Sequence, residues 1–172
     1  IDFIFHHAAI SDTRVYDQEI VLKTNLNSFD TFLTLAKKNQ ATLVYASSAS
    51  VYGNLDSPQK IGIENPENPY AYSKYAMDIA AKEFTDENPD IRVVGLRFFN
   101  VYGNREFYKG KTASMVIQLG HQLLDGEKPK LFVKSDKIFR DFVHIDDVIQ
   151  ANIKACNSSL SGAFNVGSGN AR

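Results

Sequence analysis

The chain has 172 residues, of which 44% are hydrophobic and 23% are charged, and its formal net charge is -1. These values are typical of a globular protein with a buried core. The mixed charges exclude a long basic run for a nucleic acid or an acidic membrane surface, and no apolar run approaches the roughly 20 residues that span a bilayer. We therefore expect a small-molecule partner, no nucleic acid and no membrane.

The only cysteine, Cys156, excludes an internal disulfide bond. A chain without disulfides fits a reducing compartment, so we expect a cytoplasmic protein. Cys156 closes an apolar helical run, a position typical of a packed thiol rather than of a nucleophile.

The first hundred residues alternate between strand and helix patterns. Residues 3–6 and 42–46 predict strands around a helix over 18–38, and a Pro- and Gly-containing loop then precedes a helix over 70–84 and a strand over 91–98. Strands separated by helices of this length need crossover connections. The pattern therefore predicts an α/β fold of the Rossmann type, a doubly wound parallel sheet with ligands at the carboxyl ends of the strands.

The regular alternation of strand and helix patterns ends after residue 100. It predicts a helix over 114–124, short strands near 130–133 and 139–143, a helix over 146–155 and a strand over 163–166. The last two elements are expected to return to the main sheet, and the segment before them to form a small lobe.

Tyr70 and Lys74 are four residues apart on a predicted helix, so both project from one face. A lysine cation near a phenol lowers the phenol pKa, which would make Tyr70 a proton shuttle for a hydroxyl under oxidation. The spacing alone also arises by chance, and a solvated lysine beside a half-buried tyrosine explains it as well.

A second hydroxyl cluster ends the strand that precedes this helix. Ser48 follows an apolar run and lies some twenty residues before Tyr70, which returns the chain to the same edge of the sheet. A serine there can hydrogen-bond both a substrate oxygen and the phenol, although a strand-end turn or a helix cap explains it equally well. Together Ser48, Tyr70 and Lys74 predict a catalytic triad.

Several motifs follow one another in a recognisable order. They are Asn25 and the runs HHAA at 6–9, SSASVYG at 47–53, NPYAYSK at 68–74, RFFNVYG at 97–103 and RDFVHIDDV at 140–148. With these motifs the chain resembles the extended short-chain dehydrogenase/reductase family, in particular its nucleotide-sugar epimerases and dehydratases. The resemblance covers nearly the whole chain.

The resemblance implies a nicotinamide dinucleotide, which we expect to be NADP, with NAD as the alternative. The implied cofactor-binding residues are His7, Ala8, Ala9, Asn25, Lys74 and Val101, with Lys74 holding the nicotinamide ribose. Without the motifs, tight strand packing would explain Ala8 and Ala9, and a helix-surface amide would explain Asn25.

The domain organisation follows from the same resemblance. We assign residues 1–100 to part of an NAD(P)-binding Rossmann domain, 101–145 to a substrate-binding lobe, and 146–172 to the return to the first domain. Because the first residues already have the pattern of an interior strand, we expect a piece of a longer protein whose Gly-rich βα unit precedes Ile1. We also expect a homo-oligomer.

Two features separate the branches of this family. Its dehydratases carry an Asp-Glu pair after the serine to expel a hydroxyl, whereas this chain has Ala49 and Ser50, which disfavours water elimination. Residues 100–115 resemble the epimerases that invert carbon 6 of an ADP-linked heptose, a precursor of lipopolysaccharide core. That resemblance implies that Lys109 is a second acid/base opposite Tyr70; a mobile surface lysine is the alternative.

The chemistry accounts for two acid/base groups. Carbon 6 of the heptose has no activated C-H bond, so a hydride must leave to give a ketone and return on the other face. The oxygen needs a proton partner in either pose, and Tyr70 and Lys109 can serve one pose each. Two other functions are open, a UDP-hexose 4-epimerase of the same family and a noncatalytic module that binds a nucleotide sugar.

The implied substrate-binding residues are Ser48, Asn100, Lys111, Gln118, Phe132, Ser135 and Arg140. The planar fork of Arg140 suits a diphosphate, while a surface ion pair with Asp141 or Asp146 is the alternative. Phe132 fits either a nucleotide pocket or a strand core. Lys111 and Gln118 depart from the residues that are usual in this branch.

His144, Asp146 and Asp147 lie close together in the sequence and could be read as metal ligands. We interpret Asp146 instead as the N-cap of the following helix and predict no metal site.

Overall fold

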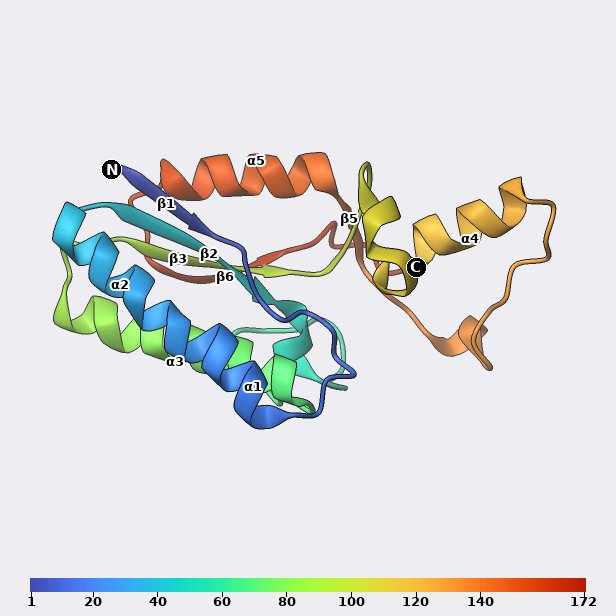
Figure 1. The fold of residues 1–172 in the computed structure, drawn as a ribbon, viewed down its shortest axis with the longest axis horizontal. Helices are drawn as coiled ribbons and strands as arrows, with labels where there is room; N and C mark the ends of the chain where they lie inside the picture. Colours follow the sequence, from blue (N-terminus) through green and yellow to red (C-terminus); the bar gives the residue numbers. More distant parts are fainter.

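The computed structural model describes residues 1–172 and has a parallel sheet at its centre (Figure 1). Its strands, in spatial order, are β1 (Phe3–His6), β2 (Thr42–Ser48), β3 (Val93–Phe98) and β6 (Gly162–Val166). All three neighbouring pairs are parallel. At the carboxyl end of this sheet, β4 (Asn100–Tyr102) and β5 (Phe142–His144) form a second parallel pair.

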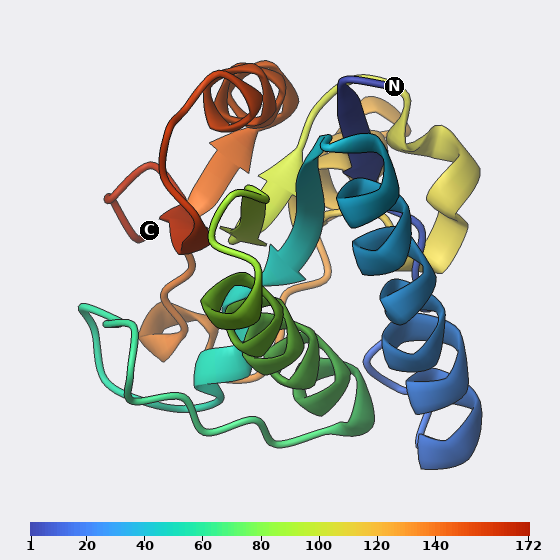
Figure 2. The same cartoon turned by 90° about the vertical axis from the view of Figure 1, so that its left-hand side faces the viewer.

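Helices cover both faces of the main sheet (Figures 1 and 2). On one side lie α1 (Gln18–Leu22), α2 (Ser28–Asn39) and α3 (Pro69–Glu87), and on the other lies α5 (Ile145–Cys156). A fifth helix, α4 (Met115–Leu124), lies on the segment between β4 and β5, residues 103–141, which projects from the sheet and is called the projecting segment below. The expected Rossmann-like α/β architecture is confirmed. None of these helices combines the length and the apolar character needed to cross a bilayer.

The core has two parts because successive strand side chains point to opposite faces. Leu43 and Tyr45 of β2 pack with Phe29 and Met77 on the α2 and α3 side. Val44 packs on the opposite side with Cys156 of α5. The Cys156 thiol is buried, and its Sγ donates a hydrogen bond to the Ile153 carbonyl at 3.1 Å, so the expectation of a packed thiol is confirmed.

Three predicted elements differ from the structure. The helix expected over 18–38 is interrupted by a π-helical turn over Lys23–Asn27, which places Asn25 in the interior. Residues 130–133 form no strand: their apolar side chains are mostly exposed and no partner strand is present to accept their backbone hydrogen bonds. The N-cap of α5 is His144 rather than Asp146, because the His144 side chain accepts a hydrogen bond from the Asp146 backbone amide.

Gly95 of β3 provides a test of the packing between the sheet and α3. A Cβ at this position would overlap the Tyr45 phenol, which is buried and donates a hydrogen bond to Asp78 at 2.8 Å. We expect Gly95→Ala to lower the free energy of unfolding by roughly 1 to 3 kcal/mol, as overpacking does elsewhere. Chemical denaturation measures this change.

Gly120→Ala is the matched control, because a Cβ at Gly120 in α4 meets nothing within 4 Å. It should leave the stability unchanged or raise it by up to about 1 kcal/mol through helix propensity. Equal denaturation midpoints for Gly95→Ala and the parent protein would show that the sheet tolerates the extra methyl group.

Candidate active site

A cleft of about 780 Å³ opens at the carboxyl ends of the main strands. Ser48 at the end of β2, Phe98 at the end of β3 and Asn165 of β6 line it. Tyr70 lines it from the start of α3, and Arg140 lines it from the segment before β5. This is the edge at which ligands bind in open parallel sheets.

Ser48 has two roles in this structure. Its Oγ accepts a hydrogen bond from the Ser50 amide at 3.2 Å and so caps the 3-10 turn Ala49–Tyr52. The same side chain lines the cleft beside Tyr70. The capping interpretation and the site interpretation of Ser48 are therefore compatible.

Tyr70 owes its place to the way α3 begins. The Asn68 side chain accepts a hydrogen bond from the Ala71 backbone amide at 2.9 Å and so caps the helix. Pro69 occupies the first helical position, where a backbone N-H would have no partner within the helix. Tyr70 therefore lies in the first turn, at the edge of the cleft.

The acidity of Tyr70 differs from the expectation. Burial raises the pKa of the Tyr70 phenol above its ordinary value, and a hydrogen bond with the Ser48 side chain offsets part of this rise. Lys74 does not lower it here, because its Nζ lies 6.0 Å from the centre of the Tyr70 ring and donates to the Ala46 carbonyl instead.

Lys74 is a buried cation. Its side chain is 2% exposed, and its Nζ donates a hydrogen bond to the Ala46 carbonyl at 2.7 Å. Burial lowers the pKa of Lys74 from its ordinary value of 10.5 to about 8, although the nearby Asp78 carboxylate acts in the opposite direction. The ammonium is thus close to the range in which it can lose its proton.

The residues predicted to bind the cofactor are in different surroundings. His7 and Ala8 are exposed at the carboxyl end of β1, and the His7 ring stacks on Phe98 at 6.0 Å. Val101 does not line the cleft; it lines a separate cavity of about 150 Å³.

Asn25 is fully buried, so the alternative of a helix-surface amide is wrong. Its amide bonds the Ile10 backbone N-H and carbonyl at 2.8 and 3.0 Å, and donates to the Ser73 Oγ at 3.0 Å. Asn25 therefore fastens the loop after β1, which includes Ala8 and Ala9, to helix α3.

Two predicted substrate residues line the cleft besides Ser48. The Asn100 backbone and side-chain amides both donate to the Asp141 carbonyl at 3.0 Å. Arg140 is exposed and pairs with neither Asp141 nor Asp146; its Nη1 donates only to the Phe139 carbonyl. Its guanidinium is therefore available to a ligand.

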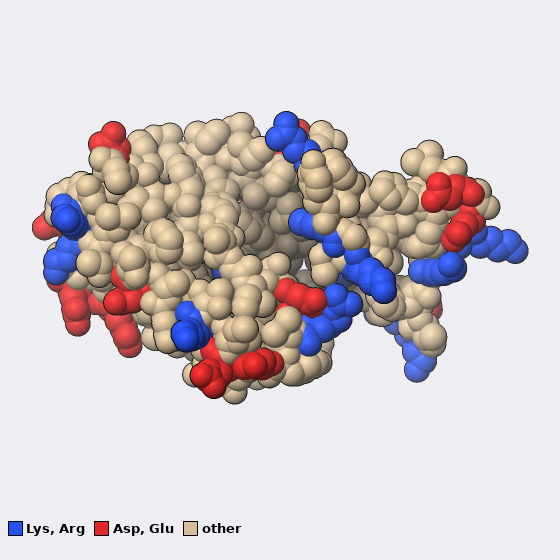
Figure 3. Space-filling model, viewed as in Figure 1, with Lys and Arg blue, Asp and Glu red and all other residues tan.

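The other predicted residues lie on the projecting segment and do not line this cleft. Lys109 is exposed and lines the 150 Å³ cavity with Val101, and the Gln118 side chain donates to the Ala113 carbonyl at 2.6 Å. Lys111, Phe132 and Ser135 are exposed. Basic residues outnumber acidic ones in this segment, and Figure 3 shows several lysine and arginine side chains over it.

Residues 1–167 match the model of the NAD dependent epimerase/dehydratase family. The chain belongs to this family.

Two relatives carry the same name. The chain is 42% identical to the ADP-L-glycero-D-manno-heptose-6-epimerase of Brachyspira hyodysenteriae, over 99% of this chain and 55% of that protein. The crystal structure of the Helicobacter pylori ADP-L-glycero-D-manno-heptose-6-epimerase is 49% identical with a TM-score of 0.91, over 100% of this chain and 55% of that one.

A more distant relative is the Thermotoga maritima UDP-glucose 4-epimerase, solved with UDP-glucose. It is 28% identical with a TM-score of 0.89, over 99% of this chain and 57% of that one. The chain thus spans about half the length of the epimerase/dehydratase family members that it matches.

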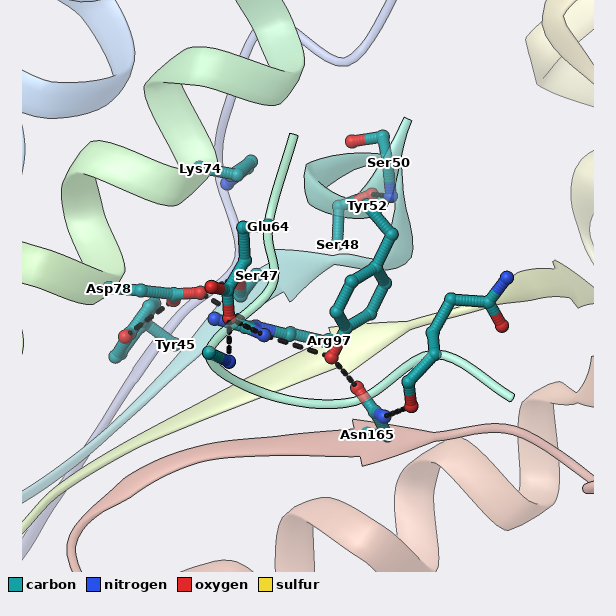
Figure 4. Close-up of polar contacts among 12 residues, drawn as sticks. Tyr45, Ser47, Ser48, Ser50, Tyr52, Glu64, Lys74, Asp78, Arg97 and Asn165 are labelled. Atoms are coloured by element: carbon teal, nitrogen blue, oxygen red, sulfur yellow. Dashed lines mark hydrogen bonds and ion pairs between the residues drawn. The ribbon is translucent and has the colours of Figure 1, made fainter. Parts of the chain in front are cut away.

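Residues missed by the sequence analysis also line the cleft of this family member. The Asp141 carboxylate accepts hydrogen bonds from the Ser168 amide at 2.8 Å, from the Ser168 hydroxyl at 2.7 Å and from the Gly169 amide at 2.7 Å. These three bonds fix the turn after β6. The Tyr52 hydroxyl donates to Asn165 at 2.6 Å (Figure 4). The glycines that follow β6 in the sequence could have indicated the turn that Asp141 holds.

The buried Lys74 of this epimerase/dehydratase family member gives a pH prediction. The folded chain releases the Lys74 proton near pH 8, whereas the unfolded chain keeps it to about pH 10.5. Stability should therefore rise with pH within this window, because the cost of the buried charge disappears. The free energy of unfolding, taken as wild type minus Lys74→Met, should increase by about 3 kcal/mol between pH 7 and pH 10.5.

Denaturation curves at intervals across this window measure the difference. The subtraction removes the groups common to both proteins, and Lys82→Met, at an exposed position of the same helix, serves as the control with no such slope. A constant difference between wild type and Lys74→Met would contradict a lowered pKa for Lys74.

Proposed function

We propose that the protein containing this chain inverts carbon 6 of ADP-glycero-manno-heptose, a precursor of lipopolysaccharide core, with NADP as its tightly held cofactor. Ser48 and Tyr70 meet in the strand-end cleft, and Lys74 lies buried beside Tyr70. This arrangement carries the proposal, because these groups can handle the proton of a hydroxyl under oxidation. The identities of 42% and 49% to two ADP-heptose epimerases, against 28% to a UDP-glucose epimerase, support this substrate.

The donors around Lys74 fit a nicotinamide dinucleotide. An ammonium has three N-H donors, and the Ala46 carbonyl is the only oxygen that Lys74 Nζ contacts. A second donor points to the weak acceptor Met77 Sδ at 3.9 Å, so at least one donor is left for a ribose hydroxyl. His7, Ala8 and Ala9 would border the same cofactor at the end of β1, with Asn25 holding their loop. When bound, the cofactor supplies the hydride acceptor and donor at carbon 6.

The side chains of the cleft supply the proton chemistry. The Ser48 hydroxyl holds the sugar oxygen, and the Tyr70 phenol exchanges a proton with it as the alcohol becomes a ketone and is restored. The Lys74 cation makes the phenol more acidic when the two approach more closely than they do here. Asn100 faces the sugar nucleotide.

The projecting segment would supply the remaining contacts. Arg140 and the basic residues beside it favour the diphosphate. Lys111, Gln118, Phe132 and Ser135 would then contact the nucleotide and the sugar, with Phe132 offering an exposed apolar face. Lys109 would act as the acid/base for the second pose of the ketone, which requires this segment to close over the cleft.

Turnover measured from each heptose epimer tests this proposal in the complete protein. Tyr70→Phe should reduce the rate by roughly 100- to 10,000-fold in both directions, the usual contribution of a general acid/base. Lys109→Met should also reduce it strongly. The control is Lys130→Met, an exposed lysine on the same segment paired with Glu127. Unchanged rates in Lys109→Met would remove the second-base role.

A UDP-hexose 4-epimerase is the second candidate. Lys109 lies outside the Tyr70 cleft, which favours a reaction in which this lysine is incidental. Turnover of UDP-glucose with none of ADP-heptose would establish this alternative. Fluorescence titrations with NADPH and NADH decide the cofactor, and no binding of either would favour a noncatalytic module.

A further inference from the structure

A buried carboxylate lies behind the catalytic residues. Asp78 of α3 is 8% exposed and accepts three hydrogen bonds (Figure 4). They come from the Tyr45 hydroxyl at 2.8 Å, the Ser47 hydroxyl at 3.0 Å and the Arg97 Nε at 2.8 Å. Asp78 therefore joins two strands of the sheet, β2 and β3, to helix α3.

The place of Asp78 along α3 relates it to the catalytic groups. It follows Lys74 by four residues and Tyr70 by eight, so the three side chains share one face of the helix. Its partner Ser47 directly precedes Ser48 on β2. One carboxylate thus connects the helix that carries Tyr70 and Lys74 to the strand that carries Ser48.

Arg97 extends this connection to the wall of the cleft. Arg97 is 2% exposed, and its guanidinium also donates to Glu64 at 2.6 Å and to the Tyr52 hydroxyl at 2.9 Å. Tyr52 in turn donates to Asn165, and both line the cleft. Buried ion pairs of this kind add little stability over an apolar replacement of the same shape, so stability alone does not account for this network. Its hydrogen bonds instead fix the relative positions of α3, β2 and β3.

We propose that Asp78, held by Arg97, is a positioning residue that sets Ser48 against Tyr70 and places a negative charge on the helix face that carries Lys74. The inference rests on the proposed function, because it concerns the proton handling of the same site. Asp78 itself does not line the cleft and acts through its neighbours.

The electrostatic part follows from the groups that face Lys74. Tyr70 and Asp78 face it from α3, and His6 of β1 and His7, the next residue, lie near enough for their charges to interact with it. Tyr45 of β2 and Arg97 of β3 face the Asp78 carboxylate. Burial lowers the pKa of Lys74, and Asp78 is the group that raises it. Removing this negative charge should therefore lower the pKa of Lys74 further.

The test follows the titration of Lys74 by NMR in the complete protein with lysine labelled at its ¹³Cε, the signal being assigned with Lys74→Met. In Asp78→Asn the midpoint should fall by about one pH unit from its wild-type value, the size expected when one nearby opposite charge is lost. In Asp78→Glu, which keeps the charge, it should return towards the wild-type value. An unchanged midpoint in Asp78→Asn would overturn the electrostatic role.

Asp86→Asn is the matched control. Asp86 lies two turns further along α3, where it is exposed and pairs with Lys82. This variant should change neither the Lys74 midpoint nor the turnover.

Kinetics test the positioning role. Asp78→Asn should lower kcat roughly 10- to 100-fold, the order expected for a displaced catalytic group, with a smaller change in KM and with the alkaline limb of the pH profile moved to lower pH. Ser47→Ala keeps the charge and the Tyr45 contact and removes only the hydrogen bond from the residue next to Ser48, so it should lower kcat while the Lys74 midpoint stays in place. If Asp78→Asn fails to fold, Ser47→Ala still tests the positioning role.

The outcomes separate this inference from the proposed function. A wild-type protein that turns over no nucleotide sugar would refute the function, while the NMR midpoints would still decide the coupling between Asp78 and Lys74. Normal kcat values in folded Asp78→Asn and Ser47→Ala, in a wild-type protein that is active, would overturn the positioning role alone.

Discussion

Burial of the Lys74 ammonium is the constraint on which the rest of the site depends. A cation removed from water needs a hydrogen-bond acceptor, and Lys74 Nζ donates to the Ala46 carbonyl on β2, while the Asp78 carboxylate, one turn further along α3, favours the charged form. The contact with Ala46 brings the helix close to the end of the strand. With the helix in that place, Tyr70 from its first turn and Ser48 from the strand end line the same cleft.

Strongly periodic segments could be predicted from the sequence, because their apolar faces are buried where the pattern requires. The strands around residues 3–6 and 42–48 and the helix after Asn68 are such cases. Periodicity does not reveal a π-helical turn, so the pattern alone suggests a helix-surface amide for Asn25, whose side chain is in fact buried. It also cannot tell whether a partner strand exists, which is why the apolar run 130–133 was wrongly predicted as a strand.

The candidate site likewise has residues whose position could be predicted from the sequence and residues whose position could not. Ser48, Tyr70 and Arg140 reach the cleft through elements of the sheet or the backbone next to it, and the order of the motifs was enough to predict them. Lys109 depends on how the projecting segment lies over the body, which no local pattern encodes. The acidity of Tyr70 depends on its burial and on where the Lys74 Nζ points, and both are properties of packing in three dimensions.

The projecting segment between β4 and β5 contributes no side chain to either hydrophobic cluster of the core. It leaves and rejoins the body through one short parallel pair of strands, with a buried Glu106 carboxylate bonded to Gly103 and Ser114 at its base. Its sequence can therefore diverge without weakening the sheet that positions Ser48 and Tyr70. The segment beside the cleft and the sheet beneath it can thus change independently, so that one fold can present different surfaces above the same strand ends.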